Sequence, residues 1–220
     1  MIRIGRSATV TSDGASNLEN LRARFSRQNF FLFPSLLEPE LLDFIQAQIT
    51  RGEFYERVHG GIGSNKELCM TQNSAFAALL LLMNDEKLFQ IVQDITQCRP
   101  IGCFEGRIYR VIPGHGHHDA WHSDMAEHRL VGMSLNLSSG PYTGGILEIR
   151  ERASGKLVSE VANVGIGDAV IFRLSDNLQH RITDVEGKAA KTAFAGWFRA
   201  RPRFLSLLKG VGEQNEKEPQ

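Results

Sequence analysis

The sequence predicts an α+β protein in which supporting helices precede an antiparallel β-sandwich or barrel. Two features lead to this prediction. Residues 29–100 carry apolar side chains at helical spacing, whereas residues 101–200 divide into short β-branched or aromatic segments separated by turn residues. Helices followed by a run of strands are typical of α+β folds. The length of 220 residues, 42% of them hydrophobic, suits a single domain spanning residues 1–220.

The N-terminal region is expected to begin with a loose lead-in, because residues 1–28 show no clear hydrophobic period. A helix is then predicted over about 36–50, where apolar residues recur every four positions. Ser35 and Glu38 have the spacing of a capping box at its start. Pro39 falls in the first turn, where a missing amide costs little.

Two more helices are expected before Pro100. The apolar run Ala75–Met83 is too short to span a bilayer and is interpreted as a short buried helix. Another helix is predicted to start after Asn84 or Asp85, with apolar residues along one face.

Strands are predicted throughout the rest of the chain, except in its tail. The candidate strands are 102–112, 121–125, 129–137, 144–150, 157–163, 169–173, 179–185 and 191–199. Glycine, proline, serine and asparagine between these segments supply the turns. The tail over 212–220 is charged and lacks apolar anchors, so it is expected to be disordered.

The charge and cysteine content narrow the class of protein. Lys+Arg and Asp+Glu are equal at 25 each, so no basic excess indicates a nucleic-acid partner. No apolar stretch is long enough for a membrane span, and the polar N-terminus lacks the core of a signal peptide. Three cysteines without a CxxC pair indicate buried side chains in a reducing compartment. The sequence therefore favours a cytoplasmic protein without nucleic acid or membrane among its partners.

Histidine gives the most informative pattern, because four of the seven lie in the stretch HGHHDAWHSD. On a strand, residues i and i+2 face the same way, so His122 and Asp124 would present an imidazole and a carboxylate side by side. His180, on a distant predicted strand, would add a second imidazole. Two histidines and one carboxylate form the facial triad that binds non-haem iron(II) and leaves coordination positions open for oxygen chemistry.

A second His-x-Asp pattern competes for this assignment, since His117 and Asp119 have the same spacing. We prefer His122 and Asp124 because apolar residues flank that pair, giving the alternation of a half-buried strand, whereas Asp119 lies in a polar, turn-like run. Either histidine of the chosen set, taken alone, is more simply a packed or surface residue. The assignment therefore depends on the three ligands occurring together with further motifs.

An ordered series of such motifs extends from about Ile108 to Arg199. It consists of Tyr109, His122-Ser123-Asp124, Leu135-Asn136, Gly144-Gly145-Ile146-Leu147, Gly167-Asp168 before an apolar strand, His180-Arg181, and Lys191 before Trp197-Phe198. This order and spacing resembles the double-stranded β-helix core of Fe(II)/2-oxoglutarate-dependent dioxygenases, especially the prolyl 4-hydroxylase-like branch. The resemblance implies a jelly-roll or cupin-like core with N-terminal supporting helices.

The resemblance also implies roles for individual residues. The residues that correspond to the iron ligands are His122, Asp124 and His180. Lys191 corresponds to the cation that pairs with the distal carboxylate of 2-oxoglutarate, and Tyr109 would be a second contact. Lys188 is the nearest competitor, but it lies in a predicted turn at 186–188, after which Lys191 would start the second strand of a hairpin. The implied cofactors are Fe(II) and 2-oxoglutarate, with ascorbate as a compatible reductant.

Two positions bear on the details of this resemblance. Many relatives carry Ser or Thr two places after the basic residue, where this chain has Ala193, and the neighbouring Thr192 should face the opposite way. Relatives that halogenate replace the ligating carboxylate with Gly or Ala, so Asp124 favours hydroxylation.

The expected function is an oxygenase that hydroxylates an amino acid, a peptide or protein side chain, or a small natural product, with release of succinate and CO₂. The expected partner is accordingly a small-molecule or peptide substrate. Two alternatives stay open. One is a cupin-type metal-dependent enzyme that does not use 2-oxoglutarate, for which the HGHH cluster could supply further ligands. The other is a non-catalytic β-sandwich that binds a ligand or partner.

Overall fold

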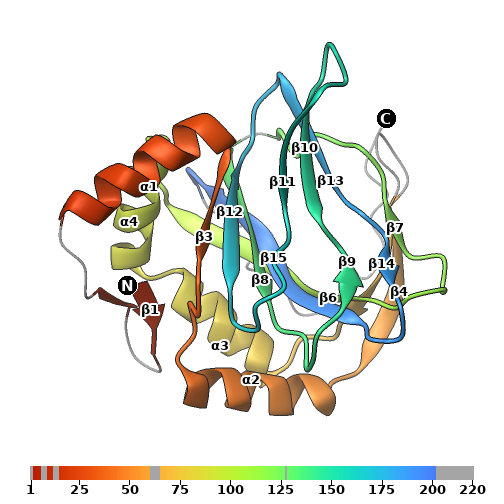
Figure 1. Ribbon diagram of the computed structural model, residues 1–220. Helices are drawn as coiled ribbons and strands as arrows, with labels where there is room; N and C mark the ends of the chain where they lie inside the picture. Colours follow the sequence, from red (N-terminus) through yellow and green to blue (C-terminus); the bar gives the residue numbers. More distant parts are fainter. Residues whose placement is uncertain (1, 6–8, 12–14, 60–64, 127, 202–220) are drawn as a thin grey trace.

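The protein consists of two facing antiparallel sheets with helices packed on the outer side of the larger one (Figure 1). The computed structural model describes residues 2–5, 9–11, 15–59, 65–126 and 128–201. The expected disorder of the tail over 212–220 lies outside the described residues.

The larger sheet is built from strands that are far apart in the sequence. Its strands are β3 (Phe30–Phe33), β4 (Phe54–His59), β5 (Asn65–Met70), β6 (Cys103–Val111), β7 (His118–Asp119), β8 (Arg129–Asn136), β12 (Ala169–Arg173) and β15 (Lys191–Arg199). Their order is β3-β12-β8-β15-β6-β5-β4, and β7 pairs with β5 beside this path. The long strand β15 therefore lies in the middle of the sheet, paired along its whole length with β6 and over most of it with β8.

The smaller sheet has the order β11-β10-β13, from β10 (Leu147–Glu151), β11 (Leu157–Val161) and β13 (Leu178–Ile182). Two short pairs complete the described strands: β1 (Ile2–Ile4) with β2 (Thr9–Thr11), and β9 (Thr143–Gly144) with β14 (Val185–Glu186). Apolar side chains of the two sheets meet in a buried cluster formed by Leu147, Ile149, Val161, Val170 and Phe172. This cluster closes the interior on one side of the metal ligands described below.

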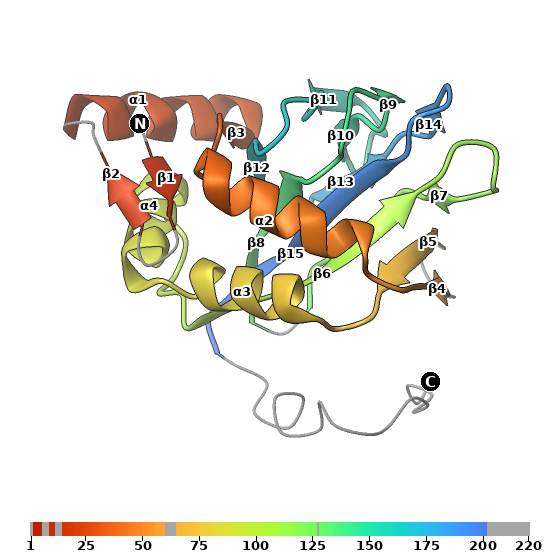
Figure 2. The same ribbon diagram turned by 90° about the horizontal axis from the view of Figure 1, so that it is seen from below.

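The helices cover the other face of the larger sheet. They are α1 (Ala15–Gln28), α2 (Pro39–Thr50), α3 (Ser74–Met83) and α4 (Glu86–Thr96). Seen from below, α2 and α3 lie across the strands of the larger sheet (Figure 2). Their apolar faces pack with outward-facing strand residues such as Phe104, Phe194 and Phe198 in one core cluster. Burial of this apolar surface is the main source of stability for the scaffold.

The alternation along β15 determines which residues face the interior between the sheets. Phe194 and Phe198 belong to the core beneath the helices. Side chains alternate along a strand, so the odd-numbered positions from Lys191 to Trp197 face the smaller sheet. Residues paired across strands share a face, which places Tyr109, the partner of Ala193, on the same inner surface.

The strand predictions after residue 100 are confirmed with one exception, although 144–150 is divided between β9 and β10 and 179–185 between β13 and β14, and the double-stranded β-helix is present. The exception is 121–125, where only an isolated bridge at His122 forms. The short helix over Ala75–Met83 is confirmed as α3, but only its face with Ala75, Leu79 and Met83 is buried, while Leu81 is exposed. The next helix is confirmed as α4, which begins after Asp85 with the Asp85 side chain accepting a hydrogen bond from the Leu88 amide at 2.9 Å.

Several predictions for residues 1–100 differ from the structure. The loose lead-in is wrong over α1, because Leu18, Leu21 and Phe25 pack on the main core. The strands β3, β4 and β5 lie in the region expected to be mainly helical. The helix expected over 36–50 starts at Pro39, and its N-cap residue Glu38 makes no side-chain capping bond. The capping box fails because Ser35 adopts a positive φ of 48° and its amide donates to Asp168.

Lys191 is not in a hairpin with the strand of His180, which corrects another expectation. β13 belongs to the smaller sheet, while β15 belongs to the larger one. Between them the chain forms β14, which pairs with β9. The connection therefore crosses from one sheet to the other, and this crossing directs Lys191 into the space between the sheets. Among the described residues, no helix is long and apolar enough to cross a membrane.

Replacing Gly196 with alanine is expected to lower the free energy of unfolding by about 1–3 kcal/mol, the usual cost of overpacking. Gly196 lies in the middle of β15, and a Cβ there would clash with the backbone of Glu105 and Gly106 on β6. Urea denaturation measures the change. Gly140→Ala is the matched control, since a Cβ at Gly140 meets nothing within 4 Å. Equal stability of the two variants would contradict the tight packing of β15 against β6.

Candidate metal centre

The two histidines are brought together by their own backbones. His122 and His180 form an isolated antiparallel bridge. The His122 amide donates to the His180 carbonyl at 3.1 Å, and the His180 amide donates to the His122 carbonyl at 2.9 Å. Residues directly opposite in such a pair project to the same side. The imidazole rings consequently lie with their centroids 4.4 Å apart.

The bridge lies where the two sheets meet. β7, just before His122, pairs with β5 of the larger sheet, next to its edge strand β4. His122 itself pairs with the edge of β13 in the smaller sheet. The short segment 118–122 is therefore a seam between the sheets. Asp119, expected in a turn-like run, belongs to β7 instead.

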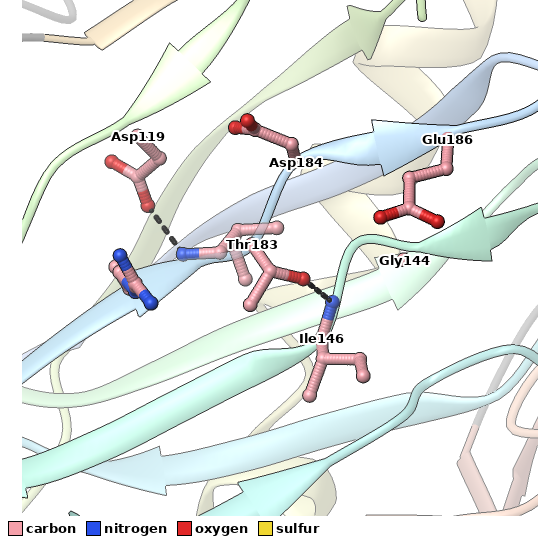
Figure 3. Close-up of a pocket in the computed structure, with 8 residues that line it drawn as sticks. Asp119, Gly144, Ile146, Thr183, Asp184 and Glu186 are labelled. Carbon is pink, nitrogen blue, oxygen red and sulfur yellow. Dashed lines mark hydrogen bonds between the residues drawn. The ribbon is translucent and has the colours of Figure 1, made fainter.

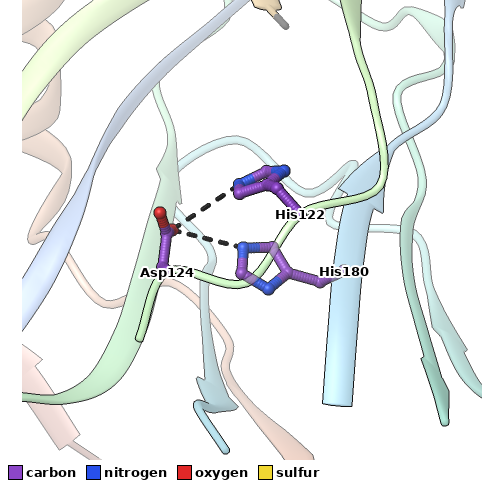
Figure 4. Close-up of side chains that lie close together, drawn as sticks. All are labelled: His122, Asp124 and His180. Atoms are coloured by element: carbon purple, nitrogen blue, oxygen red, sulfur yellow. Dashed lines mark hydrogen bonds and ion pairs between the residues drawn. The ribbon is translucent and has the colours of Figure 1, made fainter. Parts of the chain in front are cut away.

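Asp124 completes a three-residue cluster at this seam (Figure 4). Its Oδ2 atom lies 3.3 Å from Nε2 of His180 and 3.7 Å from Nε2 of His122. One ligand atom from each residue lies within 4.8 Å of the others, and among the described residues this is the group able to hold a metal ion. Two imidazoles and a carboxylate are the donor set of non-haem iron(II) sites. The predicted ligands thus converge, although Asp124 is outside any strand.

Two neighbouring side chains hold the Asp124 carboxylate. The indole Nε1 of Trp197 donates to Oδ2 at 2.8 Å, and Nη1 of Arg129 lies 3.3 Å from Oδ1. The guanidinium of Arg129 also stacks on the Trp197 ring, 3.6 Å from its centroid. These contacts fix the orientation of the carboxylate on the inner face of β15. The even spacing of Trp197 from Lys191 in the sequence already indicates that the two side chains share a face.

Trp121 anchors the seam to the outer face of the smaller sheet. Its ring lies beneath the guanidinium groups of Arg150 and Arg181, at 4.2 Å and 4.7 Å from the ring centroid. Arg181 in turn pairs with Glu148 at 2.6 Å. Stacked cations of this kind stabilise the position of an aromatic ring. Trp121 therefore restrains the chain immediately before His122.

The remaining histidines of the HGHH stretch do not join the cluster. His115 and His118 are exposed. His117 is buried, and its Nδ1 accepts a hydrogen bond from the Ile112 amide at 2.9 Å. That contact closes the turn at 113–116, so His117 has a structural role. This arrangement disfavours a site with additional histidine ligands.

Lys191 and Tyr109 are both buried on the inner surface. The Lys191 ammonium donates to the Gly145 carbonyl at 2.8 Å and lies 5.8 Å from the centroid of the Tyr142 ring. Burial lowers the pKa of Lys191 to about 8, partly opposed by the charge of Asp119. Burial, reinforced by the charge of Glu67, raises the pKa of Tyr109 well above its usual value. Tyr109 is thus a neutral hydroxyl group, while Lys188 is exposed.

Other polar side chains on β5, β6 and β15 form contacts close to Tyr109 or next to Lys191 in the chain. Thr192 faces the opposite way, as expected, and its hydroxyl accepts a hydrogen bond from Arg110 at 3.1 Å. On the inner face, Arg107 pairs with buried Glu67 at 2.6 Å and lies 5.6 Å from the Tyr109 ring centroid. The pairing of Glu67 with Arg107 could not be predicted from the sequence, because β5, which carries Glu67, was not predicted as a strand.

In the absence of a metal ion, the charges around His122 favour the protonated form of its imidazole. Burial acts to lower the pKa of His122, but its hydrogen bond to Asp124 and the charges of Asp119 and Asp124 raise it to about 9. Burial acts to raise the pKa of Asp124, but the hydrogen bonds from both histidines hold it well below its usual value. Without metal, His122 therefore carries a proton at neutral pH that a metal ion must displace.

Metal binding near neutral pH is accordingly expected to release about one proton per ion. Calorimetric titration of the metal-free protein with Co(II), in buffers of different ionisation enthalpy, measures this number. The release should vanish above the His122 pKa of about 9. Binding without proton release near neutral pH would show that His122 is already neutral in the metal-free protein.

Comparison with known proteins agrees with this geometry. Residues 106–199 match the family described as the 2OG-Fe(II) oxygenase superfamily. Among curated protein sequences, no significant match was found.

Several solved structures share the fold. A prolyl-4-hydroxylase from Pseudomonas putida is 22% identical, with a TM-score of 0.62 over 84% of this chain and 100% of that one. A prolyl hydroxylase from Trichoplax adhaerens, in complex with a peptide fragment of hypoxia inducible factor, is 13% identical, with a TM-score of 0.59 over 92% and 99%. The epimerase SnoN from nogalamycin biosynthesis is 13% identical, with a TM-score of 0.62 over 93% and 94%.

These likenesses establish the double-stranded β-helix fold, and the family match covers the segment that carries all three ligands. Residues 106–199, which include all three ligands, are therefore similar to the 2OG-Fe(II) oxygenase superfamily, whose members use Fe(II) and 2-oxoglutarate.

Proposed function

We propose that this protein is an Fe(II)- and 2-oxoglutarate-dependent oxygenase, which hydroxylates an amino acid, a peptide or protein side chain, or a small natural product, and releases succinate and CO₂. The observation that carries the proposal is the convergence of His122, Asp124 and His180 at the seam between the sheets. Asp124 favours hydroxylation over halogenation, because a ligating carboxylate occupies the position that a halide would need.

The residues present fit both groups that the family requires. His122, Asp124 and His180 would hold Fe(II), because two imidazoles and one carboxylate match its preferred donors. Lys191 would hold the distal carboxylate of 2-oxoglutarate, because its buried ammonium donates to a carbonyl and lies near an aromatic ring, neither of which is an anion, and so favours an anionic ligand. When bound, Fe(II) and 2-oxoglutarate supply the oxidising chemistry that activates O₂.

The chain itself supplies orientation and a dry environment. Trp197 and Arg129 orient the Asp124 carboxylate. The ring of Phe172, with its centroid 4.8 Å from that of His180, forms an apolar wall on one side of the cluster. Such a wall limits the access of water and fixes the imidazole by packing. The small side chain of Ala193, between Lys191 and Trp197 on the same face, leaves room for a cosubstrate.

The substrate class is supported by analogy only. The similar prolyl hydroxylase from Trichoplax adhaerens binds a peptide, whereas the equally similar SnoN is an epimerase. A peptide and a small molecule are therefore both retained as substrates. The cupin-type alternative is disfavoured because His115 and His118 are exposed and His117 binds the backbone of Ile112.

Purified protein supplied with Fe(II) and 2-oxoglutarate is expected to form succinate slowly even without a substrate, and a screen of amino acids and peptides should find compounds that accelerate it. His122→Ala, Asp124→Ala and His180→Ala should each abolish succinate formation, because each removes a metal ligand. His118→Ala is the matched control, since this exposed histidine of the same loop should retain full turnover. Turnover by a ligand variant, or its loss in the control, would overturn the ligand assignment.

Lys191→Ala is expected to weaken 2-oxoglutarate binding by roughly 10–100-fold, as for the loss of a charged hydrogen bond. In the wild type, affinity should also decline as pH rises above the Lys191 pKa of about 8, because only the ammonium form attracts the carboxylate. Lys191→Arg should remove this decline, since arginine stays charged. Anaerobic titration of the Fe(II) protein, followed by its visible absorption, measures the affinity. Lys188→Ala is the control, and a loss of affinity there would move the assignment to Lys188.

A further inference from the structure

Asp119 lies behind the metal cluster, at the point where the two ligand-bearing segments meet. Its Oδ2 atom accepts a hydrogen bond from the Ile182 amide at 2.8 Å, two residues after His180 (Figure 3). Its Oδ1 atom lies 3.4 Å from Nδ1 of His122. A single carboxylate therefore contacts both the strand that carries His180 and the imidazole of His122.

The contact is on the side of the imidazole that the metal does not use. Nε2 of His122 faces Asp124, while Nδ1 faces Asp119 and the carbonyl of Ala120, which is 2.8 Å away. Two acceptors around Nδ1 select the tautomer that carries its proton there. That tautomer leaves the lone pair on Nε2 free for a metal ion.

We propose that Asp119 is a positioning residue for metal binding, which orients His122 and increases the electron donation of its Nε2 atom. The Asp119 side chain is only 18% exposed, so its charge acts on His122 with little screening by water. Its Oδ1 atom is buried and, among the described residues, accepts no hydrogen bond that meets strict geometry. A small rotation of the His122 ring toward Oδ1 on metal binding would satisfy this atom.

The chemistry at Nδ1 explains why the effect should reach the metal. A carboxylate beside Nδ1–H draws the proton toward itself and leaves more electron density on the ring. The loss of such an outer partner typically costs 10–100-fold in metal affinity. The second His-x-Asp pattern, His117 to Asp119, therefore contains no metal ligand, but its aspartate supports the ligand that follows.

Asp119→Asn is the informative variant, because the asparagine oxygen can still accept the Ile182 amide while the charge is lost. Two control variants separate a specific effect of Asp119 on His122 from a general effect of losing a carboxylate charge. Asp184→Asn removes a charge from the same pocket of about 500 Å³, which Asp119, Asp184 and Glu186 line. Asp168→Asn alters a carboxylate that accepts a backbone amide, that of Ser35 at 2.7 Å, away from the metal ligands.

The experiment measures Co(II) binding to the metal-free proteins without 2-oxoglutarate, by calorimetry and by the visible absorption of bound Co(II). Asp119→Asn should bind Co(II) at least about tenfold more weakly than the wild type, with shifted absorption bands. In its Co(II) form, the shifted NMR signal of the His122 Nδ1 proton should exchange with solvent faster. Both controls should match the wild type in affinity and spectrum.

The outcomes distinguish this inference from the proposed function, on whose ligand assignment it rests. Wild-type protein that binds no Co(II) would refute the ligand assignment itself. Wild-type affinity and an unchanged spectrum in Asp119→Asn would refute only the role of Asp119. An equal loss in Asp184→Asn would also refute that role, because general electrostatic attraction would then explain the effect. If Asp119→Asn folds poorly, the exchange rate of the Nδ1 proton in its folded fraction decides the question.

Discussion

The backbone bridge between His122 and His180 is the constraint on which the site depends. Two hydrogen bonds fix the distance between the residues before any metal arrives, so the protein need not organise its ligands during binding. Preorganisation of this kind reduces the conformational entropy that binding must overcome. Trp121, Trp197, Arg129 and Phe172 then restrain the rings and the carboxylate around that fixed pair. The ligand geometry is thus a property of sheet pairing, refined by side chains.

The location of the bridge links the fold to the chemistry. The segment 118–122 pairs with β5 of the larger sheet and with β13 of the smaller one, so the ligands lie where the two sheets are joined. Lys191 and Trp197 reach the same interior from β15, in the middle of the larger sheet. One wall of the interior is the larger sheet, which is supported by the helices and the core beneath them. The other wall is the smaller sheet. The three metal ligands and Lys191 therefore face a common interior between the two walls.

Much of this architecture can be predicted from the sequence, for identifiable reasons. Strands after residue 100 are delimited by turn residues and carry β-branched or aromatic side chains, which is a local signal. The three ligands were identified through spacing and resemblance, but the geometry behind the i, i+2 argument was wrong, since His122 is placed by its bridge and Asp124 lies outside any strand. The helix α1 escaped prediction because Leu18, Leu21 and Phe25 stand among many polar residues. The role of Asp119 depends on pairing between distant segments, which no local pattern encodes.

The large separation of the ligands along the chain has a consequence for the folded state as a whole. Asp124 and His180 are 56 residues apart in sequence, and a metal ion between them would act as a removable cross-link. A metal ion that binds only the native state adds to its stability by mass action. Iron supply would then govern the lifetime of the protein as well as its turnover, so that a cell short of iron would lose the enzyme itself sooner than one that is replete.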